Sequence, residues 1–394
     1  MSRENLNIAL AGIGGYGNLY VDRLIDKENK GLKLSAVMDP YPERCDKLAE
    51  LKKRKIPLYN DLDSLFSRHK IDLTIISSPI HFHVPQTKTA LLNGSHVLCE
   101  KPIAPTVAGA EEIISARDKS DKIVAIAYQW SFARPIIELK KDIMSGLFGR
   151  PELLKTIVLW PRGKDYYNRS SWAGKIRDNQ GRYILDSVAN NATAHYLHNM
   201  FFVLGESLNK SSCPEKVSAE LYRANSIENY DTAVARVITK EDVELLFYVS
   251  HAVNELIHPA FCYQFEKATI KYGEFAGIDD GKIKAFFKDG SEKTYDNPEN
   301  DLFRKLWVTI DAIRKNDKDQ ITCIPETAIS HTKCIETMQS SMSEISNFPD
   351  DIVKLDRKKE LVYVKGLPEI LKECYQKEKM ISELDNTDLH IPKV

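Results

Sequence analysis

The sequence NIALA at residues 7–11 runs directly into GIGGYG at residues 12–17. The segment Ile8–Ala11 is apolar without alternation, which predicts a strand buried on both of its faces. A helical segment follows, from about Gly15 to Asp26. A glycine-rich turn between a buried strand and a helix is the context in which the pattern G-x-G-x-x-G binds a dinucleotide. The start of the chain is therefore predicted to form such a turn.

Each glycine of the pattern has its own predicted task. Gly12 permits the tight turn, Gly14 lets the backbone approach a pyrophosphate, and Gly17 allows the helix to pack closely on the strand. The helix N-terminus offers unpaired N–H groups and a partial positive charge to the phosphates. We expect the whole turn to contact the cofactor, namely Gly12, Ile13, Gly14, Gly15, Tyr16 and Gly17.

An acidic residue ends the second predicted strand, Leu34–Met38. Asp39 stands where a carboxylate accepts hydrogen bonds from the ribose of the adenosine. A carboxylate at this place repels a 2′-phosphate, which favours NAD over NADP. Arg44 lies close enough in the sequence to keep NADP open as a second cofactor.

Strands and helices alternate up to about residue 127, and the pattern then changes. The alternation predicts a parallel sheet with right-handed crossovers, which is a Rossmann dinucleotide-binding domain over residues 1–127. Beyond it, several strands follow one another with no helix between them. Residues 128–394 are therefore predicted to form an α+β domain with a large, mainly antiparallel open sheet, so that the fold class is α/β. Its predicted strands are Leu153–Trp160, Lys216–Tyr222, Thr232–Thr239, Val243–His251, Phe261–Ile270, and Lys282–Lys288 paired with Glu292–Tyr295.

Composition excludes several classes of protein. The 394 residues carry 55 basic and 56 acidic side chains, a net charge of −1, which argues against nucleic acid or an anionic membrane as a partner. No stretch approaches the roughly 20 apolar residues of a transmembrane helix, and the first apolar run is too short for a signal peptide. The seven cysteines show no Cys-x-x-Cys spacing, so we expect reduced thiols and a cytoplasmic protein.

A second group of motifs follows the glycine turn. Ser78-Pro79 is followed by His83, and Glu100-Lys101-Pro102 ends a predicted strand, His96–Cys99. Together with the glycines and Asp39, these residues closely resemble the glucose–fructose oxidoreductase/inositol dehydrogenase (Gfo/Idh/MocA) family. The resemblance covers the N-terminal domain and extends more loosely to about Gly205. It implies a Rossmann domain joined to an open antiparallel sheet that houses the substrate.

The resemblance gives Lys101 a catalytic role and a contact with both cofactor and substrate. In the family, the lysine of the E-K-P motif contacts the hydroxyl that is oxidised. An ammonium group there would stabilise negative charge that develops on the oxygen as hydride leaves the neighbouring carbon. Burial beside a cationic nicotinamide would lower the pKa of the lysine and allow proton exchange.

Other positions are carried over as cofactor contacts. Glu100 is expected to orient the cofactor or the lysine rather than to move protons. Ser78, Pro79 and His83 match a stretch that runs along the cofactor in the family. Gln129 follows the sixth predicted strand, where the family places polar residues of the pocket.

A second catalytic element of the form Asp-x-x-x-His is expected before a helix, and two alignments compete for it. Counting back from Gly205 selects Asn191 and His195, whereas counting forward selects Asp186 and Asn190. We favour His195, because an imidazole can accept a hydroxyl proton near neutral pH. Asn191 would then hold the ring or bind substrate, and Asp186 would fold back to supply the missing charge.

Aromatic and polar residues gather between these two elements, at residues 160–172. Sugar rings present C–H faces that suit aromatic side chains and hydroxyl edges that suit Arg and Asn. We expect Arg162, Tyr167 and Trp172 to bind substrate together with Lys101, Asn191 and His195. His195 and His198 have the spacing of a metal-binding pair, but no third ligand is evident, and no metal is predicted.

The resemblance, together with these residues, implies an NAD-dependent oxidoreductase that acts on a secondary hydroxyl or ketone of a sugar, cyclitol or derivative. Two alternatives remain open on the same scaffold. One is an NAD-dependent glycosidase-type enzyme that oxidises, eliminates and reduces in turn; the other is a dinucleotide-binding regulator without activity. Because the open sheet commonly forms the oligomer face in this family, a homodimer or homotetramer is expected.

Overall fold

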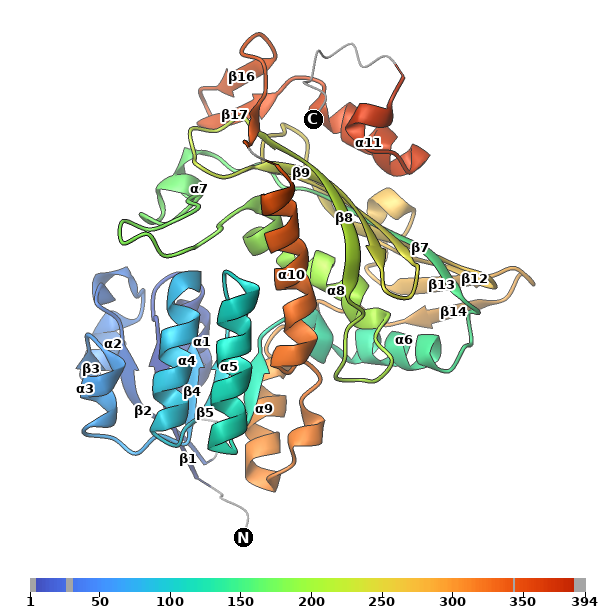
Figure 1. Cartoon of the computed structure of the whole chain (residues 1–394). Helices are drawn as coiled ribbons and strands as arrows, with labels where there is room; N and C mark the ends of the chain where they lie inside the picture. Colours follow the sequence, from blue (N-terminus) through green and yellow to red (C-terminus); the bar gives the residue numbers. More distant parts are fainter. Residues whose placement is uncertain (1–4, 26–30, 343, 386–394) are drawn as a thin grey trace. The chain divides into compact units, whose positions relative to one another are not determined.

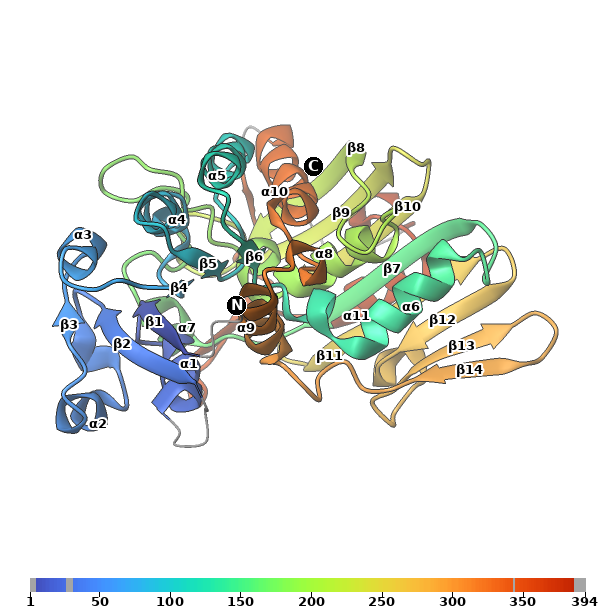
Figure 2. The same cartoon turned by 90° about the horizontal axis from the view of Figure 1, so that it is seen from below.

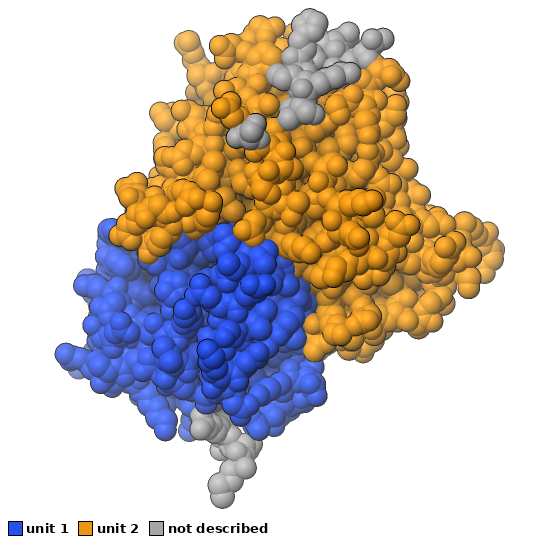
Figure 3. Space-filling view, viewed as in Figure 1, with its two compact units in different colours: residues 1–129, 303–329 blue, residues 130–302, 330–394 orange. Residues whose placement is uncertain are grey.

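The computed structural model describes residues 5–25, 31–342 and 344–385, and the chain divides into two compact units (Figure 3). Unit 1 is Met1–Gln129 with Phe303–Ile329, and unit 2 is Trp130–Leu302 with Ser330–Val394. The sequence had placed one boundary after residue 127, whereas in the structure the segment 303–329 returns to the first unit. The two segments are joined by backbone pairing, in which Ile126 N donates to Cys323 O at 2.8 Å. A local sequence pattern cannot predict a pairing between residues so far apart in the chain.

Unit 1 contains a six-stranded sheet of entirely parallel neighbours, in the order β3-β2-β1-β4-β5-β6. This is the predicted Rossmann arrangement, and the strand order reverses between β1 and β4, where ligands bind at the carboxyl ends. Figure 2 shows α4 and α5 on one face of this sheet and α1 on the other. The strands are β1 (Leu6–Ala11), β2 (Leu32–Met38), β3 (Leu58–Tyr59), β4 (Leu73–Ile76), β5 (His96–Cys99) and β6 (Val124–Ile126). The helices are α1 (Gly17–Ile25), α2 (Leu48–Lys53), α3 (Leu62–Phe66), α4 (His83–Leu92), α5 (Val107–Ser120) and α9 (Arg304–Lys315).

Unit 2 contains a nine-stranded sheet in the order β14-β13-β12-β11-β7-β10-β9-β8-β15. Two neighbouring pairs, β10 with β7 and β15 with β8, are parallel, and the others are antiparallel. The predicted mainly antiparallel sheet is therefore confirmed. The strands are β7 (Pro151–Leu159), β8 (Pro214–Arg223), β9 (Thr232–Thr239), β10 (Glu244–Ser250), β11 (Ile257–Phe265), β12 (Ala268–Tyr272), β13 (Ile283–Phe287), β14 (Glu292–Tyr295) and β15 (Ser346–Asn347).

The prediction of one continuous strand over Phe261–Ile270 is wrong. The chain turns at Glu266 and Lys267, so that β11 and β12 form an antiparallel hairpin. The turn is held by distant backbone, since Glu266 N donates to Arg150 O at 2.9 Å and Lys267 N to Phe148 O at 2.8 Å. These partners lie more than a hundred residues earlier in the chain, so a local sequence pattern could not predict the turn.

Both faces of this sheet are covered by parts of unit 2 (Figure 1). One face packs against α6 (Arg134–Met144), α8 (Ala194–Val203) and the C-terminal part of α10 (Pro325–Ser341). The opposite face is covered by α11 (Leu367–Lys377) and the short helix Ile381–Glu383, after the small hairpin of β16 (Val353–Asp356) and β17 (Leu361–Val364).

Polar contacts fasten the C-terminal layer to the sheet. Lys155 of β7 is buried, and its Nζ donates to Tyr375 O at 3.0 Å and to Glu378 Oε1 at 2.8 Å. The carboxylate of Glu220 in β8 accepts from the backbone N–H groups of Ile381, at 2.8 Å, and of Ser382, at 3.0 Å. Because these charged groups are buried, they need the C-terminal segment as their partner. Among the described residues, no helix combines the length and the apolar character that a membrane crossing requires.

Candidate functional site

The glycine turn of unit 1 is fixed by steric exclusion on its inner side. Gly12 has a φ of +82°, and a Cβ atom placed on it would lie 2.7 Å from the backbone of Ser77 and Ser78. A Cβ atom on Gly17 would lie 2.1 Å from Gly12 O. Only glycine can fill these two positions without moving backbone, so β1 and α1 meet as closely as the sequence predicted.

The outer side of the same turn is open. Gly15 has a φ of +54°, and a Cβ atom there would meet no other atom within 4 Å. Tyr16, which follows, is 39% exposed. A phosphate can therefore approach the backbone of this turn from outside, at the N-terminus of α1.

Asp39 joins the glycine turn to the end of β2. Its Oδ2 accepts from Ile13 N at 2.9 Å and from Gly14 N at 3.4 Å, while its Oδ1 accepts from Tyr41 N at 2.9 Å. Each carboxylate oxygen has two lone pairs, so these bonds leave acceptor capacity for a ribose hydroxyl. The side chain of Arg44 is exposed, and its guanidinium lies 5.2 Å from the centre of the Tyr41 ring.

Glu100 is buried in a network that the sequence did not reveal. Its Oε1 accepts from Tyr20 Oη at 2.7 Å and from Lys305 Nζ at 2.5 Å, and Lys305 Nζ also contacts Tyr16 Oη at 3.2 Å. Lys305 lies on α9, in the segment that returns to unit 1, and is fully buried. Burial alone would lower the pKa of Lys305, but Glu100 and Tyr16 outweigh it and raise the pKa above its usual range. Glu100 and Lys305 thus form a buried ion pair that holds the glycine turn through Tyr16.

Lys101 leaves the sheet at the carboxyl end of β5, directly after Glu100. Its backbone N donates to Glu100 Oε2 at 3.3 Å, and its side chain is half-buried. The peptide bond between Lys101 and Pro102 is cis. The backbone of the catalytic candidate is therefore attached to the same buried ion pair as the glycine turn.

His83 bridges the loops that follow β4 and β5. Its Nδ1 lies 2.7 Å from Pro102 O and its Nε2 lies 2.9 Å from Ser78 O. The ring is buried, and this burial lowers the pKa of His83. Both ring nitrogens contact protein carbonyls, so the side chain positions the two loops; its expected contact with the cofactor stays a prediction.

The remaining cofactor candidates of unit 1 lie at the carboxyl ends of the strands. Ser78 and Pro79 follow β4, and Ser78 Oγ donates to Gln86 Oε1 at 2.5 Å. Gln129 follows β6 and is half-buried. In a doubly wound sheet this edge is the ligand-binding edge, which agrees with their predicted contacts.

In unit 2, residues of both competing alignments meet. Asp186 is buried, its Oδ1 accepts from Asn191 Nδ2 at 2.7 Å, and its Oδ2 accepts from Gly174 N at 2.6 Å. A π-helical turn, Val188–Ala192, begins just after Asp186 and brings Asn191 back to it. Asn190 is buried instead, and its Nδ2 donates to Leu185 O at 2.9 Å. The pair that can share a site is thus Asp186 with Asn191.

His195 and His198 have different surroundings. His195 lies in the first turn of α8 and is half-buried. His198 is fully buried, with Nε2 at 3.0 Å from Ser131 Oγ, and burial holds its pKa well below the usual range. Within the described ranges, no group of three or more His, Cys, Asp or Glu side chains could hold a metal ion.

The segment that the sequence assigned to substrate forms a stack of aromatic and guanidinium groups. The guanidinium carbon of Arg169 lies 3.8 Å from the centre of the Tyr166 ring and 4.9 Å from that of Trp172. Arg162 lies 5.0 Å from the same Tyr166 ring. Arg169 also lies 3.5 Å from Asp186 Oδ2, so the stack is joined to the Asp186–Asn191 pair. Tyr166 and Arg169 were not predicted as site residues, although both lie in the aromatic and polar segment 160–172.

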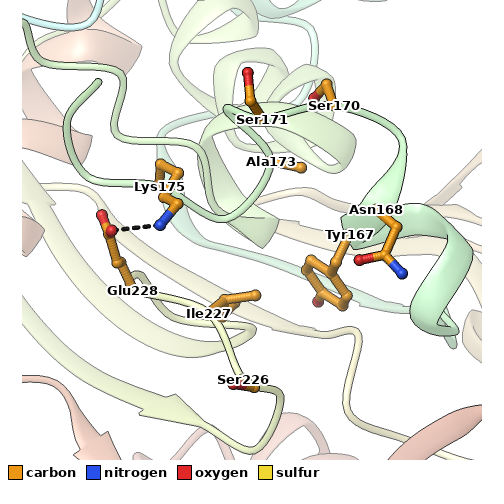
Figure 4. Close-up of a pocket in the computed structure, with 9 residues that line it drawn as sticks. All are labelled: Tyr167, Asn168, Ser170, Ser171, Ala173, Lys175, Ser226, Ile227 and Glu228. Atoms are coloured by element: carbon orange, nitrogen blue, oxygen red, sulfur yellow. Dashed lines mark hydrogen bonds and ion pairs between the residues drawn. The ribbon is translucent and has the colours of Figure 1, made fainter. Parts of the chain in front are cut away.

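A pocket of about 440 Å³ opens beside this stack (Figure 4). It lies between the segment that contains α7 (Lys164–Asn168) and the turn that joins β8 to β9. Of the predicted substrate residues, Tyr167 lines the pocket, whereas Arg162 and Trp172 do not. The lining residues are Tyr167, Asn168, Ser170, Ser171, Ala173, Lys175, Ser226, Ile227 and Glu228.

Residues 6–128 match the model of an oxidoreductase family with an NAD-binding Rossmann fold, the Gfo/Idh/MocA family. The N-terminal part of the chain is thus similar to the NAD-binding domain of the Gfo/Idh/MocA family. The resemblance carried by the glycine turn, Asp39 and the E-K-P motif is thereby confirmed, as is NAD as the cofactor of the family that these residues represent.

Curated relatives that match part of this chain are named as dehydrogenases. The inositol 2-dehydrogenase of Rubrobacter xylanophilus is 26% identical over 163 residues, which are 41% of this chain and 45% of the relative. The D-glucoside 3-dehydrogenase of Escherichia coli is 30% identical over 149 residues, 38% of this chain and 42% of the relative. The chain thus matches less than half the length of these curated relatives.

Solved structures share the fold over most of the chain. The WlbA dehydrogenase of Bordetella pertussis, in complex with NADH and UDP-GlcNAcA, has a TM-score of 0.70 at 19% identity and covers 86% of this chain and 98% of its own. An oxidoreductase of Agrobacterium radiobacter, in complex with NAD⁺, L-tartaric acid and magnesium, has a TM-score of 0.67 at 17% identity, with 86% and 96% covered. At such identities the likeness concerns the fold.

Proposed function

We propose that this chain is an oxidoreductase of the Gfo/Idh/MocA type, which transfers hydride between NAD and a secondary hydroxyl or ketone of a sugar, cyclitol or close derivative. The observation that carries the proposal is the attachment of Lys101 to the glycine turn. Lys101 follows Glu100 at the carboxyl end of β5, and Glu100 is joined through Lys305 to Tyr16. A basic residue whose backbone is attached to a dinucleotide turn can serve a hydride transfer, because the turn and the residue then keep a constant relation to each other.

The residues of unit 1 fit NAD. The outer side of the turn is open at Gly15, and the carboxylate of Asp39 stands at the end of β2. When bound, NAD supplies the carbon that accepts or returns the hydride. The turn would hold the pyrophosphate, and Asp39 would accept hydrogen bonds from the ribose and disfavour a 2′-phosphate. The proposed preference is therefore NAD over NADP.

In this proposal, separate roles toward the substrate belong to Lys101, to His195 and to the Asp186–Asn191 pair. The ammonium of Lys101 holds the substrate oxygen and stabilises the charge that develops there. The imidazole of His195 takes the hydroxyl proton. Asn191 binds substrate in an orientation fixed by its hydrogen bond to Asp186. Substitution of any of these side chains should then affect the hydride-transfer step.

The proposal is tested with purified protein, a panel of sugars and cyclitols, and NAD or NADP, by the absorbance of the reduced cofactor. On a substrate that the protein oxidises, Lys101→Ala should lower kcat by about 10²–10³-fold. Lys53→Ala, which removes an exposed lysine of α2, serves as the control. Full activity of Lys101→Ala would disprove the role of the lysine.

The same panel separates the two alternatives. A glycosidase-type enzyme would release a free sugar from a glycoside without net NADH. A regulator would bind NAD and exchange no hydride with any polyol. The seven cysteines are all free thiols, which supports the further proposal that the protein works in the cytoplasm.

A further inference from the structure

The pocket in unit 2 shares its wall with the candidate catalytic pair. Gly174 donates from its N to Asp186 Oδ2 at 2.6 Å, and its O accepts from Glu228 N at 3.0 Å and from Asn229 N at 2.9 Å. Gly174 has a φ of +68°, and a Cβ atom on it would lie 2.7 Å from Ile227. The loop Gly163–Lys175 and the β8–β9 turn are thus in close contact next to Asp186. The pocket opens where these two segments meet (Figure 4).

The lining of the pocket is polar and electrically balanced. Its charged side chains, among the described residues, are Lys175 and Glu228, and these pair with each other at 2.6 Å. Because the cation is already neutralised by the neighbouring carboxylate, the lining offers no net positive charge to attract a phosphate or pyrophosphate. An uncharged ligand does not depend on such a charge.

The uncharged groups of the lining suit a polyhydroxylated ring. Tyr167 presents an aromatic ring, Asn168 an amide, and Ser170, Ser171 and Ser226 present hydroxyls. Ser170 Oγ is buried and has no hydrogen-bond partner among the described residues. A buried polar atom without a partner is costly, and a ligand hydroxyl or water would satisfy it. The volume of about 440 Å³ lies within the roughly 300–1,000 Å³ of small-molecule sites.

We propose that this pocket is a subsite for an uncharged glycosyl group next to the ring that is oxidised. The preferred substrate is then a glycoside such as a disaccharide, rather than a free monosaccharide, a cyclitol or a nucleotide sugar. The inference rests on the proposed hydride transfer, because the adjacent Asp186–Asn191 pair is assigned to the oxidised ring there. Binding energy from the second ring would be used to position the first.

The test uses a variant that fills the pocket without touching the proposed machinery. Ser226 lies on the β8–β9 turn with an exposed side chain, so Ser226→Trp can occupy the pocket. Kinetics are measured for matched pairs: cellobiose and D-glucose, lactose and D-galactose, with UDP-glucose and myo-inositol as further probes. For the wild type, kcat/KM of the preferred disaccharide should exceed that of its monosaccharide by more than about tenfold.

Ser226→Trp should remove this advantage, raising KM for the disaccharide about tenfold or more while kcat/KM for the monosaccharide stays within about twofold. Ser291→Trp, an exposed serine on the β13–β14 turn, is the matched control and should change neither value. Equal use of free sugar and disaccharide by the wild type, faster use of UDP-glucose, or an equal loss for both sugars in Ser226→Trp would overturn the inference.

If no sugar yields reduced cofactor, hydride transfer as proposed has failed, and the pocket is tested by itself. Isothermal titration of cellobiose, lactose and D-glucose into the full chain reports binding without turnover. Binding of a disaccharide that Ser226→Trp weakens and Ser291→Trp preserves would support the subsite. Absence of disaccharide binding to the wild type would reject it.

Discussion

The glycine turn of unit 1 and the loop Gly163–Lys175 of unit 2 are both assigned to ligand binding, but they are held in different ways. The turn is fixed by backbone contacts that exclude a Cβ atom at Gly12 and Gly17 and by a buried ion pair. The loop is held by backbone at its end, where Gly174 N donates to Asp186, but its middle is held by half-exposed side chains that stack on one another, Arg169 with Tyr166 and Trp172. A site that binds one constant cofactor can be rigid in its backbone, whereas a site for a variable substrate depends on side chains.

The largest expected effect lies in the buried ion pair beneath the turn. Lys305→Met leaves Glu100 buried without its cation, so the free energy of unfolding of unit 1 should fall by about 3–5 kcal/mol. Native-state hydrogen exchange of β1 and β5 measures this loss. Lys315→Met, on the exposed side of the same helix, should stay within about 0.5 kcal/mol of the wild type.

A second substitution in the pair sharpens the interpretation. Glu100→Gln combined with Lys305→Met removes both charges and should recover part of the stability lost in Lys305→Met. If the double variant were less stable by the full sum of the two single losses, the two residues would not act as a pair.

The glycines of the turn should differ from one another. Gly17→Ala places a Cβ atom 2.1 Å from Gly12 O and should cost about 3 kcal/mol and weaken NAD binding more than tenfold. Gly15→Ala meets open space, and only its φ of +54° is unfavourable, so the cost should be about 1–2 kcal/mol. Thermal unfolding and NAD titration of both variants measure the difference; equal losses would show that steric exclusion does not define the turn.

The stack of Arg169 with Tyr166 and Trp172 should contribute less to the free energy of unfolding than the buried ion pair or Gly17 does. Arg169→Gln removes the guanidinium between Tyr166 and Trp172 and should destabilise unit 2 by about 1–2 kcal/mol. Arg177→Gln breaks a comparable but exposed contact with Tyr183 and is the matched control, with an expected loss of about 0.5 kcal/mol. Thermal unfolding gives the stabilities, and proteolysis of the loop reports its local opening. A loss for Arg169→Gln no greater than for the control would mean that the stack does not hold the loop.

The smallest effect concerns pH. Burial lowers the pKa of His251, which packs against Tyr166, to about 3. The unfolded chain takes up a proton at this residue below about pH 6.5, while the folded chain does not, so stability falls as the pH drops from about 6.5 towards 3. Relative to the wild type, His251→Asn should therefore gain about 1 kcal/mol of stability between pH 7 and pH 5.5. Urea unfolding at the two pH values measures it; a constant difference between the proteins would contradict a neutral, buried His251.

The sequence predicted the parts of the molecule that local chemistry determines. The roles of Gly12, Gly17 and Asp39 could be predicted because they depend on the steric and electrostatic requirements of a single turn. The parallel sheet could be predicted from the alternation of strands and helices. Lys305 could not be predicted, because its role depends on a segment that returns to unit 1 from a distance. The meeting of Asp186 with Asn191 required the π-helical turn, and the β11–β12 turn required distant backbone partners. The catalytic, cofactor and substrate roles of the individual residues stay predictions.

The helical layer formed by α11 and Ile381–Glu383 bears on how copies of this chain could associate. The expected homodimer or homotetramer was to be built through the broad face of the second sheet, yet the chain's own C-terminal segment occupies one face and α6, α8 and α10 the other. Self-association through this face of the sheet would therefore require the segment to be displaced, which would expose Leu246, Tyr248 and the ammonium of Lys155. Any assembly that keeps the segment in place has to use loops, sheet edges or helix surfaces instead.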